Sequence, residues 1–81
     1  MAKARRVLAA LLRDGWVIEH QAGSHRKLRK NGVQGVFSFH DKEDLGGPAM
    51  AKVAREFGYT VDELRRRIQE ASHAPDGALL L

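Results

Sequence analysis

The pair Asn31-Gly32 constrains the fold most, because it separates two segments in which apolar and polar residues alternate. Asn-Gly is the pair that a two-residue type I′ turn favours, since both turn positions need a positive φ. The flanking segments, residues 24–30 and 33–40, are therefore predicted to be antiparallel strands joined in a hairpin. A third segment, residues 16–21, is rich in large and β-branched side chains. The sequence thus predicts a three-stranded antiparallel meander.

Helical periodicity flanks these strands on both sides. Apolar residues recur at helical spacing over residues 3–13, which predicts an amphipathic helix that ends at a glycine. Pro48 suits the first turn of a second helix and Gly58 its C-terminal cap, while Thr60 and Glu63 form a capping box that opens a third helix. We therefore predict an α+β fold with the order α-β-β-β-α-α, in which the apolar stripes face one core. The stripe residues are Ala4, Val7, Leu8, Leu11, Leu12, Met50, Val53, Ala54, Phe57, Val61, Leu64 and Ile68.

The length of 81 residues predicts one domain, residues 1–71, followed by a tail, residues 72–81, that has no periodicity and is expected to be flexible. A domain of this size buries only about 60–65 percent of its unfolded surface, so a polymer held against the surface fits better than an engulfed metabolite. The absence of cysteine excludes thiol catalysis, disulfides and cysteine-based zinc sites. No apolar run has transmembrane length and no signal-peptide cleavage site follows the N-terminus, so we expect a cytoplasmic protein without membrane contact.

The charge is unevenly distributed along the chain. Up to His40, eight lysines and arginines oppose two acids, and from Asp41 onward six oppose eight, so the two parts carry net charges of +6 and −2. The N-terminal part is therefore expected to face a polyanion, if the protein binds one. The alternative is an ordinary solvated cationic surface.

Alternation along the strands predicts one buried and one open face of the sheet. Leu28, Phe37 and Phe39 belong to the buried face, and Arg26 and Lys30 fall on the same side, where we expect them to extend outward at the ends of the sheet. The other face then carries titratable and polar side chains from all three strands. They are Glu19, His25, Lys27, Arg29, Gln34, Ser38 and His40.

The element order and one short motif resemble the HicA family, the toxins of bacterial toxin–antitoxin pairs. The motif is Gly23-Ser24-His25 at the opening of the second strand, and the resemblance covers roughly residues 4–68. It implies a fold similar to the double-stranded RNA-binding domain, cleavage of messenger RNA without a metal, and silencing by a HicB antitoxin. It also implies that His25 is the catalytic histidine. The chain departs from many relatives at two positions: Arg26 replaces a second histidine, and His40 follows Phe39 instead of a proline.

The chemistry of RNA agrees with what the resemblance implies. RNA carries its own nucleophile, the 2′-hydroxyl, and an imidazole that titrates near neutrality can act as base or acid. His25 is the first candidate for this role, and His40 is the candidate for the complementary acid if its strand pairs beside the second strand. A metal site made by these two histidines would lack further ligands, so we expect none. The candidate RNA-binding residues are Gly23, Ser24, Arg26, Lys27, Arg29 and Lys30, with Lys3 and Arg6 on the first helix. No feature assigns a role to His20 or His73.

Two alternatives remain open at this point. Residues 50–68 have the spacing of a helix-turn-helix, in which Arg65, Arg66 and Arg67 would meet DNA, although a structural helical hairpin explains the same spacing. An RNA-binding domain without catalysis would share every feature except a working His25. The partners that the resemblance implies are an mRNA substrate and a HicB-like antitoxin. We expect this antitoxin to be acidic, and DNA to be contacted only indirectly, through the antitoxin complex.

Overall fold

The computed structural model describes residues 2–73 of the chain. Three strands form one antiparallel sheet in the order β2-β3-β4, and a second, two-residue pairing joins β1 to β5. This arrangement confirms the predicted α+β class and the α-β-β-β-α-α layout. The elements are β1 (Ala2–Lys3), α1 (Ala4–Arg13), β2 (Val17–Ala22), β3 (His25–Lys30), β4 (Val33–Phe37), β5 (Asp44–Leu45), α2 (Gly47–Phe57) and α3 (Val61–His73). The predicted tail begins inside the last turn of α3, and its remainder, residues 74–81, lies outside the described residues.

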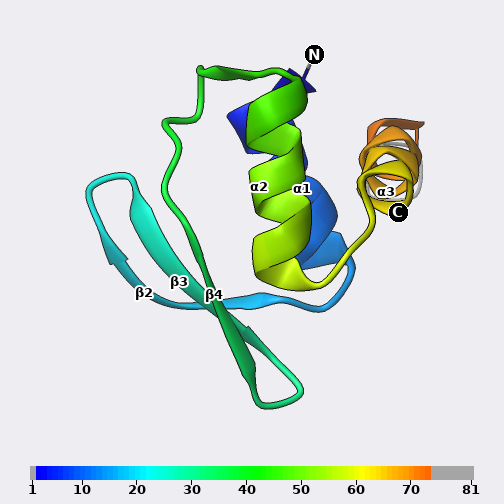
Figure 1. Ribbon diagram of the computed structural model, residues 1–81. Helices are drawn as coiled ribbons and strands as arrows, with labels where there is room; N and C mark the ends of the chain where they lie inside the picture. The colour runs from blue at the N-terminus through cyan, green and yellow to red at the C-terminus, as the bar shows by residue number, and fades with distance from the viewer. Residues whose placement is uncertain (1, 74–81) are drawn as a thin grey trace, which may run out of the picture.

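The helices lie on one side of the β2-β3-β4 sheet (Figure 1). Helix α2 contacts β4, and α3 packs against both α1 and α2. Apolar side chains from all three helices meet the sheet in one buried cluster. Its strand and loop members are Trp16, Leu28, Phe37 and Leu45. None of the helices between residues 2 and 73 is long and apolar enough to cross a membrane.

The N-terminus of α1 is held by the segment that leads into β5. No side chain caps this helix, and the backbone N–H groups of Ala4 and Arg5 donate instead to the carbonyls of Glu43 and Asp41, at 2.8 and 3.1 Å. These bonds satisfy two of the donors that a helix start leaves without an intrahelical partner. The loop after β4 is thereby fixed to α1.

The turns and caps follow the local sequence. Asn31 and Gly32 both have positive φ, 50° and 80°, as the predicted type I′ hairpin requires. Gly58 ends α2 in the left-handed conformation, and the Thr60 hydroxyl accepts a hydrogen bond from the N–H of Glu63 at 3.0 Å, which confirms this half of the capping box. The third strand, predicted to reach residue 40, ends instead at Phe37.

A polar cluster joins the C-terminal ends of α1 and β3 to the middle of α3. The Asp14 carboxylate accepts a hydrogen bond from the Tyr59 hydroxyl, and it pairs with Lys30 Nζ at 2.9 Å and with Arg67 at 3.0 Å. The Tyr59 oxygen in turn accepts a bond from Trp16 Nε1 at 3.0 Å. The bond from Tyr59, with help from Lys30, lowers the pKa of Asp14 below its usual value, while burial and then the Asp14 bond raise the pKa of Tyr59 to about 12. Lys30 is therefore engaged in holding the fold together.

Gly35 marks the closest approach of β4 to α2. A Cβ atom added at Gly35 would lie 2.5 Å from Cε1 and 2.8 Å from Cδ1 of Phe57. The Phe57 ring cannot retreat easily, because Trp16 packs edge-on against it with 4.8 Å between ring centroids. Glycine at this position therefore lets the helix layer lie directly on the sheet.

We predict that Gly35→Ala lowers the free energy of unfolding by about 1–3 kcal/mol, because the added methyl overpacks the contact with Phe57. Lys52→Ala is the control, an exposed substitution in α2, the helix that carries Phe57. It should change the free energy of unfolding by no more than about 0.5 kcal/mol, as exposed substitutions do. Urea unfolding measures both variants. Equal stability of the two would show that α2 does not press on β4 as described.

Candidate functional site

The face of the sheet that the helices leave uncovered is called the open face here. Directly opposite residues of antiparallel strands share a face, so the register defines its members. Lys27 lies opposite His20 and Val36, Arg29 lies opposite Val17 and Gln34, and His25 lies opposite Ala22. Together with Glu19, every one of these side chains is exposed.

His25 is the first residue of β3. The turn Gly23-Ser24 precedes it, and Gly23 has a positive φ of 61°, which suits glycine. The residue across the pair is Ala22, whose short side chain does not shield the imidazole. His25 is exposed on a face that no described helix covers. Its ring is therefore accessible to a polymer lying along the sheet.

Two cations follow His25 along the same face, and they differ in their surroundings. Arg29 donates from Nε to Glu19 at 2.5 Å, and Glu19 also accepts a bond from Gln34 at 3.3 Å. The Arg29 contact lowers the pKa of Glu19, so this carboxylate stays ionised at neutral pH. Lys27 forms no ion pair with any residue between 2 and 73. Lys27 is thus the cation of the open face that is available to an incoming anion.

A β-bulge in β2 adds His20 to the open face, which strand alternation did not predict. Ile18 pairs with Leu28 and His20 pairs with Lys27, so Glu19 is an extra residue between the two pairs. Because a bulge places two residues opposite one, both Glu19 and His20 face the open side. No local sequence signal marks this bulge, since neither glycine nor proline occurs in β2.

Arg26 lies on the helix-covered face and is buried, which differs from the expected outward extension. Only 8% of the residue is exposed, and Nη2 pairs with Asp41 at 2.8 Å. Its Nη1 has no hydrogen-bond partner among the described residues. A guanidinium in this position cannot reach a phosphate on the open face, so we leave Arg26 out of the candidate RNA contacts.

His40 does not lie on the sheet. Its strand ends three residues earlier, because Ser38 and Phe39 leave the β3 ladder and the chain turns toward α1. The His40 N–H donates to Glu43 Oε1 at 3.2 Å, and its carbonyl accepts from the Glu43 N–H at 2.9 Å. The role of His40 as complementary acid requires that its strand pair beside β3 at this position. The described strands do not contain this pairing.

The other predicted RNA-binding residues are spread over the molecule. Gly23 and Ser24 form the turn before His25. Lys30 is on the covered face with Asp14, Lys3 pairs with Asp44 at 3.2 Å between β1 and β5, and Arg6 is exposed on α1. Of the predicted cations, the structure brings only Lys27 and Arg29 together with His25.

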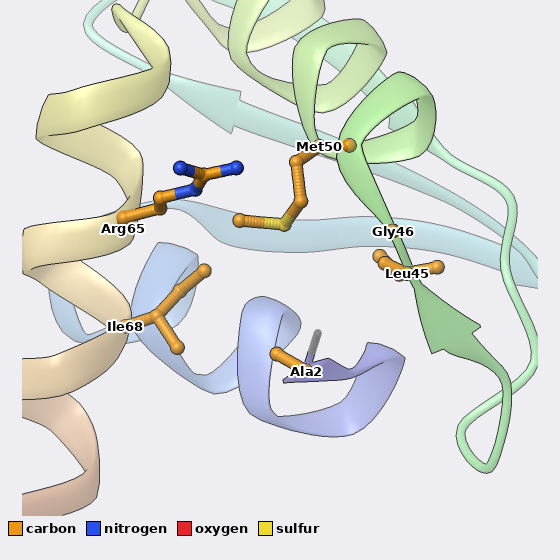
Figure 2. Close-up of a pocket in the computed structure, with 7 residues that line it drawn as sticks. Ala2, Leu45, Gly46, Met50, Arg65 and Ile68 are labelled. Atoms are coloured by element: carbon orange, nitrogen blue, oxygen red, sulfur yellow. The ribbon is translucent and has the colours of Figure 1, made fainter.

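A pocket of about 210 Å³ lies away from the open face, between β1, β5, α2 and α3 (Figure 2). Figure 2 shows that Met50 and Ile68 extend into it from two helices, with Arg65 at its side. Arg65 is its only titratable lining residue within the described part of the chain, so it offers no acid–base pair. Residues 2–73 also contain no group of three or more His, Asp or Glu side chains that could hold a metal ion.

The family comparison supports the resemblance seen in the sequence. A family model described as the HicA toxin of bacterial toxin–antitoxin systems matches residues 4–59. The chain belongs to the HicA toxin family. The match runs from α1 to the turn after α2 and includes the whole open face, whereas α3 lies beyond it. Membership makes the protein a toxin of a toxin–antitoxin system, which implies an antitoxin partner. Searches of curated proteins and of solved structures found no match.

We predict that the neighbouring cations Arg26 and Lys27 differ in their effect on stability. Arg26→Ala should lower the free energy of unfolding by about 1–3 kcal/mol, because it removes the buried stem and leaves a cavity. Arg26→Met, which keeps the volume and removes a charged group with an unpaired nitrogen, should cost less than Arg26→Ala. Lys27→Ala should stay within about 0.5 kcal/mol, as exposed substitutions do. Urea unfolding of the three variants tests this order, and equal values for Arg26→Ala and Lys27→Ala would contradict the burial of Arg26.

Proposed function

We propose that this HicA family protein is a metal-independent endoribonuclease, an mRNA interferase, in which His25 performs acid–base catalysis on the open face. The observation that carries the proposal is an exposed imidazole on the open face beside Lys27, a cation that has no ion-pair partner within residues 2–73. An open face suits a polymer substrate, because a sheet face has no walls to enclose a small molecule.

The proposed reaction uses the 2′-hydroxyl of the RNA as nucleophile. His25 transfers a proton at the reacting phosphate, and Lys27, two residues along the same face, stabilises the negative charge that develops on the phosphoryl oxygens. Arg29 adds a second cation four residues from His25 and continues the track for the backbone phosphates. The reaction needs no metal if these groups carry the proton transfers and the charge.

We further propose that the antitoxin is an acidic, HicB-like protein that covers the open face. The connections within residues 2–73 are short, so no described loop is long enough to close over His25. We therefore assign inhibition to a partner protein. An acidic partner would be steered to Lys27 and Arg29 by opposite charge and would exclude RNA by occupying the same surface.

The first test of this proposal is His25→Ala. The variant should fold as the wild type does and should cleave RNA about 10²–10⁴-fold more slowly, the usual contribution of a proton-transfer group. A gel assay on a mixed-sequence RNA measures the rate, and circular dichroism checks the fold. The control is Gln69→Ala, an exposed residue of α3 outside the sheet. Wild-type cleavage by His25→Ala would remove His25 from the mechanism.

The second test separates RNA binding on the open face from DNA binding by α2 and α3. We predict that the double substitution Lys27→Ala, Arg29→Ala weakens RNA binding for every sequence and lowers the slope of log K against log salt by about 0.7 per lost contact on single strands. The double substitution Arg65→Ala, Arg66→Ala removes the same charge from exposed positions of α3 and should have little effect. The reverse ranking, together with sequence-specific binding to duplex DNA, would favour the helix-turn-helix function.

A further inference from the structure

Transphosphorylation of RNA needs two proton transfers, and the proposed function supplies a group for only one of them. One group must remove the proton of the 2′-hydroxyl, and another must protonate the leaving 5′-oxygen. The sequence suggested His40 for the second role, but His40 lies beyond the end of β4. The partner of His25 must therefore be sought among the side chains that share the open face.

Among residues 2–73, five titratable or charged side chains belong to the open face, and the structure distinguishes among them. These are Glu19, His20, His25, Lys27 and Arg29. Glu19 is engaged by Arg29 and Gln34 and is held in its ionised form. Lysine and arginine side chains suit phosphate contacts, and the proposed function assigns Lys27 and Arg29 to that role. An imidazole is the group whose ordinary pKa lies near neutrality, which leaves His20 as the partner that chemistry favours.

The register brings His20 close to His25. His20 pairs directly with Lys27, and His25 is two residues before Lys27 on the same face, so the two histidines are diagonal neighbours on adjacent strands. The Cα atoms of diagonal neighbours are about 7–8 Å apart. Two imidazoles at this spacing can contact the two ends of one phosphodiester, with Lys27 opposite His20 and two residues from His25 on β3. Both histidines are exposed, so a strand of RNA reaches both.

The bulge at Glu19 is the feature that creates this pairing. Without the extra residue, strict alternation would turn His20 to the opposite side of the sheet from Glu19, toward the helix layer. The bulge keeps both residues on the open face, where Glu19 holds Arg29 and His20 faces Lys27. Bulges occur often beside active sites, where they redirect a side chain.

We propose that His20 and His25 form the acid–base pair of the ribonuclease reaction, so that His20 is a second catalytic residue; this rests on the function proposed above. One neutral imidazole takes the proton of the 2′-hydroxyl, and the 2′-oxygen forms a bond to phosphorus. The bond from phosphorus to the 5′-oxygen breaks with its electron pair on that oxygen. The second histidine, initially protonated, gives its proton to this oxygen. The products are a 2′,3′-cyclic phosphate and a 5′-hydroxyl, and the two histidines have exchanged protonation states.

The test compares an ordinary RNA with the same RNA that carries sulfur in place of the bridging 5′-oxygen, at the bond that the wild-type protein cleaves. A thiol has a pKa of about 8.5, so a thiolate leaves without an acid to protonate it. His20→Ala and His25→Ala should each slow cleavage of the ordinary RNA about 10²–10⁴-fold through kcat. On the sulfur-containing RNA, the variant that lacks the acid should come within about tenfold of the wild type, while the variant that lacks the base should stay slow. Gln69→Ala, at an exposed position of α3, should behave as the wild type on both.

The possible outcomes separate this proposal from the one it rests on. If His20→Ala cleaves ordinary RNA at the wild-type rate while His25→Ala does not, the ribonuclease function stands and the pair is refuted. The pair is also refuted if His20→Ala changes only KM, or if both variants are slowed equally on both RNAs. If the wild-type protein cleaves no RNA, the proposed function and the pair fall together. Recovery of one histidine variant, and not the other, on the sulfur-containing RNA establishes the pair.

Discussion

A single layer of helices covers one face of a three-stranded sheet, and the positions of the functional side chains depend on this one-sided packing. The contact that sets the layer in place is between Gly35 and Phe57, where only a glycine leaves room for the ring. Leu28 and Phe37 are fully buried beneath the helices, whereas the side chains on the opposite face are exposed. The face that remains uncovered is the one that carries His25.

The two edge strands of the sheet, β4 and β2, are protected from pairing with a further strand in different ways. Along β4, the Glu56 carboxylate accepts a hydrogen bond from the Val36 N–H at 2.8 Å, so a side chain of α2 occupies this edge. Along β2, the bulge at Glu19 disturbs the regular pattern that another strand would need for pairing. The bulge also brings His20 and Glu19 onto the same face. One irregularity therefore both protects an edge and shapes the candidate site.

The sequence predicts the elements well because their signals are local. The helix of residues 4–13 follows from its apolar stripe, and the hairpin at Asn31 follows from the φ angles that its turn requires. Three features could not be predicted, because each depends on contacts between distant segments. The end of β4 at Phe37 depends on the following loop binding the start of α1, and the burial of Arg26 depends on Asp41 in that loop. The place of His20 depends on a bulge that strand alternation cannot reveal.

The ion pairs distinguish the cations of β3 that lie on the helix-covered face from those that lie on the open face. On the helix side, acids of the loops pair with the cations and hold elements together, as Asp41 does for Arg26 and Asp14 for Lys30. On the open face, Lys27 has no ion pair within the described residues, and the pair between Arg29 and Glu19 is exposed. Exposed ion pairs contribute little to stability, since water and salt screen them. A phosphate that reaches this face therefore meets Lys27, which has no competing ion pair within the described residues. It also meets Arg29, which can release Glu19 and bind the phosphate at a small cost in free energy.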